Sequence, residues 1–291
     1  MRTTPAIQYD RFLESLRLIR ERIQTETARS VSGLRVEKPS DDPAAAGEAV
    51  ALRTRIAAAD RYASNASAVK GFLSVTDSAL SSLNDLLTSA RAEAIRGASE
   101  STDSQARGAI ATTIDSLREQ AFALARTRFE GRYIFSGTDT QADPYDSSGN
   151  YQGNTSAIRL ETGEGETITA NIAATDAFGA GTGVFGALAS LSDALRLGDT
   201  AAIQTGATSL EAALKTLSDA RTVVGTRLES AQSAADRAAQ AKVTLTSRLT
   251  EITGADLAEA ITSLSNDRAS EQMVLQTGAR IGQRSLFDFL G

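Results

Sequence analysis

The chain has 291 residues, and its charged residues, 23% of the total, leave a net charge of −6 at pH 7. This length predicts about two domains, and the acidic balance argues against a dedicated nucleic-acid-binding protein, whose surface would carry a basic stripe. Cysteine and histidine are both absent, which excludes disulfides and thiolate metal sites and removes the commonest general base and metal ligand. Tryptophan is absent and aromatic residues make up only 5%, so we expect thin contacts between helices, built from aliphatic side chains.

The N-terminal residues give no sign of a secretory signal. Charged side chains recur throughout the first twenty residues, which contain no apolar block, so this stretch is not a cleavable signal peptide. No run of 18 consecutive apolar residues occurs, so we expect no membrane span. Export would need a route that reads an uncleaved, extended N-terminus.

A first amphipathic helix is predicted before Gly33. Its apolar residues recur at alternating steps of three and four, the heptad spacing of helices that pack along one another. Gly33 ends it, because glycine can take the left-handed conformation that follows a helix. Leu13 and Leu18 lie off the heptad stripe, so there is more apolar surface than one partner covers, and the partner is either another helix of this chain or a neighbouring subunit. The stripe residues, our first candidates for a subunit interface, are Tyr9, Phe12, Leu16, Ile19 and Ile23.

The segment Asp41-Asp42-Pro43 predicts the start of a second helix. Proline suits the first helical position, and its ring keeps Asp42 out of the helical region, so that Asp42 can cap the free amides of the first turn. Two adjacent carboxylates also raise the alternative of a metal site. We favour capping, because two ligands without a third nearby do not make a site.

Two further helices are predicted before residue 130. The heptad spacing runs from Ala45 to Ala66, slips by one position and resumes from Val69 to Ala94. Such a slip marks a change of winding or a second packing partner. A polar turn at residues 97–103 separates this helix from a third, over residues 106–129.

Residues 137–182 predict a small β-rich insertion. They are rich in Gly, Asp, Ser and Thr, and two short runs alternate apolar with polar residues on either side of Gly163-Glu164-Gly165. This pattern predicts a β-hairpin. The alternating apolar residues are Ile158, Leu160, Ile168, Ala170 and Ile172.

The stretch from Gly181 to Gly186 matches the G-x-G-x-x-G pattern of dinucleotide-binding loops. That fingerprint requires a preceding strand and a surrounding βαβ unit, whereas this chain continues as helices. We interpret the glycines as the boundary between a loop and a short helix. The apolar side of that helix has Phe185, Leu188, Leu191 and Leu195.

The longest predicted helix runs from Ile203 to Ile252 and would span roughly 75 Å. Only Arg221 and Lys242 interrupt its heptad stripe. A single helix cannot bury so long a stripe, so other helices must lie along it. The remaining members of the stripe are Ile203, Ala207, Leu210, Leu214, Leu217, Val224, Leu228, Ala231, Ala235, Ala238, Leu245, Leu249 and Ile252.

A last helix is predicted after Asp256, which can cap it. The chain then ends in a strongly apolar cluster, and exposed clusters of this kind mark interaction sites. We expect the cluster to pack against the N-terminal helix or against neighbouring subunits. The interface candidates in this region are Leu257, Ile261, Leu264, Leu286, Phe287, Phe289 and Leu290.

The order of these parts resembles the flagellin-like family of flagellar proteins, and in particular its hook-associated branch. The similar stretches are residues 32–35 with 39–43, 131–138, 221–228 and 279–290. The resemblance covers essentially the whole chain, least securely residues 139–182. Met1-Arg2-Thr3-Thr4 lacks the Asn-Thr-Asn opening common in filament flagellins. The residues that carry the resemblance are Gly33, Arg35, Asp41, Asp42, Pro43, Arg221, Gly225 and Arg227.

The resemblance implies a mainly α fold, a long antiparallel helical bundle or coiled-coil rod made by the N- and C-terminal arms, with a small β-hairpin insertion. We expect three parts. Residues 1–40 and 255–291 would form a terminal coiled-coil region, residues 41–136 and 183–254 a helical rod, and residues 137–182 an outer insertion.

The resemblance also implies an extracellular structural protein of the bacterial flagellum, exported by the flagellar type III apparatus and forming a layer between hook and filament. The implied partners are further copies of the chain, the first hook-associated protein (FlgK-like), flagellin, and an export chaperone (FlgN-like) at the C-terminal segment. We expect no catalytic residue, cofactor, metal, nucleic acid or membrane insertion. The alternatives are a filament flagellin and, more remotely, a cytoplasmic coiled-coil scaffold, against which the β insertion and the apolar C-terminus weigh.

Overall fold

The computed structural model describes residues 5–146 and 149–290, apart from the side chains of residues 5, 6, 8 and 280–290. The chain forms two compact units, residues 1–57 with 242–291 and residues 58–241, which are described separately. The predicted mainly α class with a small β-hairpin is confirmed. No helix in the described ranges is long and apolar enough to cross a membrane. In chain order the elements are α1 (Pro5–Ser32), α2 (Pro43–Gly97), α3 (Ser104–Ala125), β1 (Arg128–Phe129), β2 (Arg132–Tyr133), β3 (Arg159–Gly163), β4 (Glu166–Thr169), α4 (Ala174–Phe178), α5 (Gly183–Leu197), α6 (Thr200–Thr253) and α7 (Leu257–Leu290).

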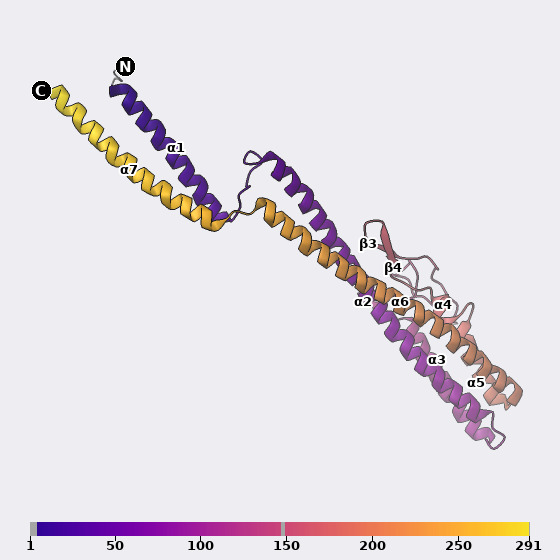
Figure 1. Cartoon of the computed structure of the whole chain (residues 1–291). Coiled ribbons are helices and arrows are strands. Elements are labelled where there is room, and N and C mark those ends of the chain that lie inside the picture. Colours follow the sequence, from indigo (N-terminus) through magenta and orange to yellow (C-terminus); the bar gives the residue numbers. More distant parts are fainter. Residues whose placement is uncertain (1–4, 147–148, 291) are drawn as a thin grey trace. The chain divides into compact units, whose positions relative to one another are not determined.

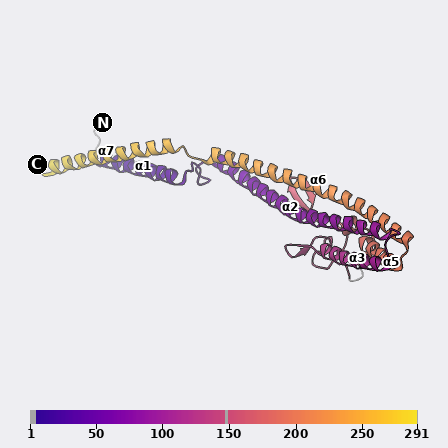
Figure 2. The same ribbon diagram turned by 90° about the horizontal axis from the view of Figure 1, so that it is seen from below.

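In the first unit, α1 and α7 run antiparallel, side by side in both views (Figures 1 and 2). Arg20 on α1 pairs with Glu271 on α7 at 2.9 Å, and Ile19 is buried between them at 6% exposure. Phe12 lies directly over Gly278, so closely that a methyl group at residue 278 would collide with its ring. The two helices therefore approach closely at this glycine of α7.

In the second unit, α2 and α6 pack antiparallel. Residues that follow one another along α2 contact residues of α6 in the reverse order. Lys70 bonds to Gln232 at 2.6 Å, and Asp77 pairs with Arg221 at 3.2 Å. Further along, Arg91 pairs with Glu211, also at 3.2 Å. The longest predicted helix is thus confirmed as a single helix covered by the N-terminal arm.

The predicted slip near Val69 coincides with a wider buried stripe on α2. From this residue onward α2 buries Phe72, Ala79 and Leu86 in addition to its predicted heptad residues. The edge of the Phe129 ring packs on Phe72, and Leu195 of α5 contacts Gly97. The buried stripe of α2 is wider here because α2 packs against Phe129 and α5 in addition to α6.

The stripe of α6 requires one correction. Every seventh residue from Ile203 to Ala238 is buried as predicted. Between them the buried residues are Gly206, Ala220 and Ala234, whereas the predicted Ala207, Arg221 and Ala235 are only half-buried. At these three places the buried residue lies one position before the predicted one, whereas the predicted Leu214 and Leu228 are half-buried and pack against the core.

The small sheets lie in the second unit. The predicted hairpin is confirmed as β3 and β4, which pair antiparallel with Leu160 opposite Ile168. A second hairpin, β1 with β2, was not predicted. Its turn residues Glu130 and Gly131 both have positive φ, 49° and 78°, as the tightest hairpin turns require.

Short helices and aromatic rings fill the rest of the insertion. Residues 174–178 form α4, which the sequence pattern did not predict. The rings of Phe122 and Phe185 stack with centroids 4.1 Å apart, and Tyr145 lies against Phe185 at 4.9 Å. A chain with few aromatic residues thus concentrates them where the insertion joins α3 and α5.

Candidate functional site

The connectors at the ends of α1 and α7 bring the N- and C-terminal halves of the chain together within the first unit. Gly33 has a φ of 68° and ends α1, as predicted. Leu34 and Gly254 then form an antiparallel bridge, flanked by bonds from the amide of Arg35 to the carbonyl of Thr253 at 2.8 Å and from the amide of Ala255 to the carbonyl of Gly33 at 2.9 Å.

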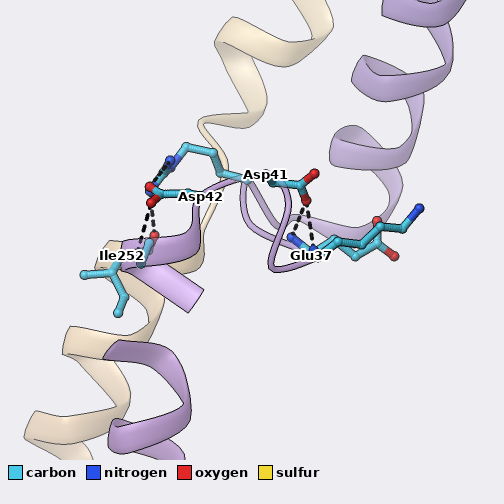
Figure 3. Close-up of polar contacts among 7 residues, drawn as sticks. Glu37, Asp41, Asp42 and Ile252 are labelled. Atoms are coloured by element: carbon cyan, nitrogen blue, oxygen red, sulfur yellow. Dashed lines mark hydrogen bonds and ion pairs between the residues drawn. The ribbon is translucent and has the colours of Figure 1, made fainter. Parts of the chain in front are cut away.

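Asp42 caps the start of α2, and Asp41 holds the turn that precedes it (Figure 3). The Oδ1 of Asp42 accepts the amide of Ala45 at 3.0 Å, which confirms the predicted cap. The Oδ2 of Asp41 accepts the amides of Lys38 at 2.8 Å and Glu37 at 3.1 Å. The bond from the amide of Lys38 is the main reason that the pKa of Asp41 lies below its ordinary value, and the bond from Ala45 does the same for the pKa of Asp42.

Arg35 links this cap to the end of α6. Its Nη1 lies 3.2 Å from the Oδ2 of Asp42, and its Nη2 donates to the carbonyl of Ile252 at 2.9 Å. Asp42 and Ile252, the two residues that it joins, are labelled in Figure 3. The last carbonyls of a helix carry partial negative charge, so the guanidinium stands between two electronegative groups. We call Arg35, Asp42, Ile252 and Thr253 the Arg35 clasp.

The other motif residues lie on α6 in the second unit. Arg221 pairs with Asp77, so a basic residue at the edge of the buried stripe has an acidic partner on α2. Arg227 donates from Nη1 to the carbonyl of Asn171 at 2.6 Å, and burial lowers its pKa. It therefore fastens the residues after β4 to α6. An added methyl group at Gly225 would meet no atom within 4 Å, so nothing in the structure explains that glycine.

The predicted interface residues of α1 and α7 fall into two groups. Ile19 is buried in the helix pair, and Phe12, Leu16, Ile23 and Leu264 are half-buried. Three others are exposed, namely Tyr9, Leu257 and Ile261.

The surface of α7 also exposes two apolar residues that the sequence analysis missed. These are Met273, at 61% exposure, and Leu275. Met273 lies off the heptad stripe of Leu257 and Ile261, so periodicity did not reveal it, whereas Leu275 stands two heptads after Ile261 on that stripe and was overlooked. The side chains of Leu286, Phe287, Phe289 and Leu290 lie outside the described residues.

The G-x-G-x-x-G stretch has a packing role. A methyl group at Gly183 would collide with the carbonyl of Phe178, and one at Gly186 would collide with Thr182. The neighbouring groove, about 760 Å³, is lined entirely by uncharged residues of α4, α5, α6 and the loop between α4 and α5. It therefore offers no cation to a phosphate group.

Residues 7–140 match the family described as the bacterial flagellin N-terminal helical region. The flagellar hook-associated protein 3 of Salmonella typhimurium is 31% identical over 139 residues, which cover 47% of this chain and 44% of that protein. The match thus spans less than half the length of this curated relative.

Solved structures resemble the fold over a larger share of the chain. The FlgL of Bacillus cereus has a TM-score of 0.61 at 22% identity and covers 69% of this chain and 99% of its own. The flagellar junction protein FlgL of Legionella pneumophila has a TM-score of 0.59 at 14% identity, over 72% of this chain and 100% of its own. At these identities the likeness concerns the fold. Residues 7–140 are thus similar to the flagellin N-terminal helical region, and the fold resembles that of FlgL structures.

Proposed function

We propose that this chain is a structural subunit of the bacterial flagellum and forms a layer at the junction between hook and filament. The support comes from the helical-region match over residues 7–140 and from the relatives, which are named as hook-associated and junction proteins. The chain's likeness to FlgL structures over about seven tenths of its length favours the junction over the filament.

The observation that carries the assembly role is the uneven distribution of apolar side chains on α7. Among the described side chains of α7, the large apolar ones that are half-buried are Leu264 and Val274, beside small or polar residues such as Ala260 and Ser270. Leu257, Ile261 and Met273 face outward instead. A helix pair with more large apolar side chains outside than inside gains stability when neighbours cover it, at about 1.5–3 kcal/mol for each fully buried side chain.

The mechanism follows from this distribution. Neighbouring copies, an FlgK-like protein on the hook side and flagellin on the filament side would cover the exposed faces of α1 and α7. The free energy of burial would then appear as assembly instead of monomer stability. Export without a cleaved signal, with an FlgN-like chaperone on the apolar C-terminal segment, completes the proposed route.

Substitution of the exposed apolar residues tests the role of this face. The double variant Leu257→Ser/Ile261→Ser should be secreted normally but should fail to remain in the flagellum, because its α7 surface no longer binds a neighbour. The matched control is Gln272→Ser, an exposed polar position on the same helix. Sheared flagella are probed with an antibody, and incorporation of the double variant at the control's level would contradict the proposal.

A further inference from the structure

In the Arg35 clasp, one arginine joins three segments of the first unit. Its guanidinium reaches the cap of α2 through Asp42 and the last turn of α6 through the carbonyl of Ile252. Its own amide bonds to Thr253, the final residue of α6. The side chain comes from the connector that follows α1, so the end of α1 is tied to both helices.

This arrangement has a geometric requirement that arginine meets and lysine does not. The two acceptors are a carboxylate oxygen and a backbone carbonyl on different segments, and each is reached by a different nitrogen of the planar fork. An ammonium is a point charge without a fork, so it cannot reproduce both bonds in this geometry. The contact is therefore specific for arginine, although its side chain is 46% exposed.

The connectors have few other means of holding their relative position. The connector from α6 to α7 has only residues 254–256, and the one from α1 to α2 has residues 33–42. Leu34 and Gly254 form the β-bridge between them. Three backbone bonds join the two segments at this bridge, from the amides of Arg35 and Val36 to the carbonyl of Thr253 and from the amide of Ala255 to the carbonyl of Gly33, and the side chain of Val36 is buried. The fork of Arg35 adds two side-chain contacts to this short backbone pairing.

We propose that the Arg35 clasp is a conformational lock that fixes the direction in which α1 leaves the ends of α2 and α6. With the clasp closed, the helix pair of α1 and α7 has one orientation within the first unit. With it open, α1 and α7 are held to α2 and α6 by their connectors, by the short backbone pairing around Leu34 and Gly254, and by the buried Val36. The proposal concerns the isolated chain and does not depend on the junction role.

Spin-label distances test the lock on the full chain, which has no native cysteine to compete for labelling. Labels at Glu14→Cys on α1 and Val50→Cys on α2 lie at exposed positions of the first unit. Pulsed electron–electron double resonance should give one narrow distance distribution between the two labels for the chain that is otherwise unaltered. The added substitutions Arg35→Met and Arg35→Lys should both lose the narrow peak, because neither residue has a two-nitrogen fork.

The control and a further variant separate the lock from a general loss of structure. Arg55→Met removes an exposed arginine on α2 that makes no ion pair or side-chain hydrogen bond among the described residues, and it should keep the narrow peak. Asp42→Asn keeps a capping oxygen but removes the charge that faces Arg35, so the peak should broaden while the helical circular dichroism signal is unchanged. Asp42→Asn therefore tests the lock even where an Arg35 variant fails to fold. An unaltered distribution in folded Arg35→Met, or equal broadening in Arg55→Met, would overturn the proposal.

Discussion

Arg221 on α6 and Asp77 on α2 form an ion pair, with the Nε of Arg221 3.2 Å from the Oδ1 of Asp77. Heptad periodicity alone places Arg221 in the apolar stripe. The structure places it at the edge, at 36% side-chain exposure, while the neighbouring Ala220 is buried at 4%. The charge is therefore paired across the helices instead of being buried in the stripe.

The position of Arg221 predicts a small effect of its removal. Arg221→Leu should change the free energy of unfolding by less than about 1 kcal/mol, since half-exposed ion pairs contribute little. Ala220→Arg should destabilise by about 3 kcal/mol or more, because it buries a charge without a partner. Denaturant unfolding of the two variants measures this difference, and equal losses would mean that the stripe has been assigned to the wrong face.

Two glycines in the middle of long helices should respond in opposite ways to the same substitution. A methyl group at Gly71 of α2 would lie 2.9 Å from the ring of Phe129, so Gly71→Ala should destabilise by about 1–3 kcal/mol. At Gly225 of α6 no atom lies within 4 Å, so Gly225→Ala should stabilise by up to about 1 kcal/mol through helix propensity. Thermal unfolding of both variants tests the pair, and a destabilised Gly225→Ala would reveal a contact or bend that the structure does not show.

Two neighbouring tyrosines differ in what their hydroxyls bind. The hydroxyl of Tyr145 is buried without a hydrogen-bond partner among the described residues, and burial raises its pKa. The hydroxyl of Tyr151 lies 2.7 Å from the carbonyl of Asn154, and burial raises its pKa to about 12. Tyr145→Phe should therefore be neutral or stabilising, whereas Tyr151→Phe should cost about 0.5–1.5 kcal/mol. Urea unfolding compares them, and a larger loss for Tyr145→Phe would indicate that its hydroxyl has a bound partner.

The first unit should lose stability in acid through Asp42. The pKa of Asp42 in the folded chain lies below its ordinary value of 3.8, chiefly because its carboxylate accepts the amide of Ala45 and, next, because of Arg35. The unfolded state therefore binds the proton first as the pH falls. The stabilisation is present above pH 3.8 and is lost as the pH falls through the lowered value.

Asp42→Asn should remove this part of the acid dependence. The comparison is made by following unfolding of both proteins from pH 6 down to pH 2, with Glu14→Gln as an exposed carboxylate control. An identical pH dependence in Asp42→Asn and the unaltered chain would contradict the assignment of this titration to the cap.

Periodicity and capping rules predicted the features that depend on local sequence. The long helices, the Asp42 cap, the end of α1 at Gly33 and the β3–β4 hairpin all follow from spacing or from one residue's conformational preference. The three-part division of the chain and the interface roles of the terminal residues stay predictions.

The features that were missed depend on contacts remote in sequence. Arg35 binds a carbonyl 217 positions away, and no pattern within its own segment identifies that partner. The shift of the α6 stripe depends on which side α2 and α5 cover, because small residues such as Gly206 and Ala220 give a weak apolar signal. The β1–β2 hairpin has only two residues in each strand, too few for alternation to be seen.

Deletion of the gene from its own motile organism tests the junction role most directly. The cells are examined for hooks by electron microscopy, and the culture medium is assayed for flagellin. We predict intact hooks without filaments and flagellin released into the medium, both restored by a plasmid copy. Cells that lose or shorten their filaments without releasing flagellin would show instead that the chain is a filament subunit, and cells with normal filaments would contradict any essential role at the junction.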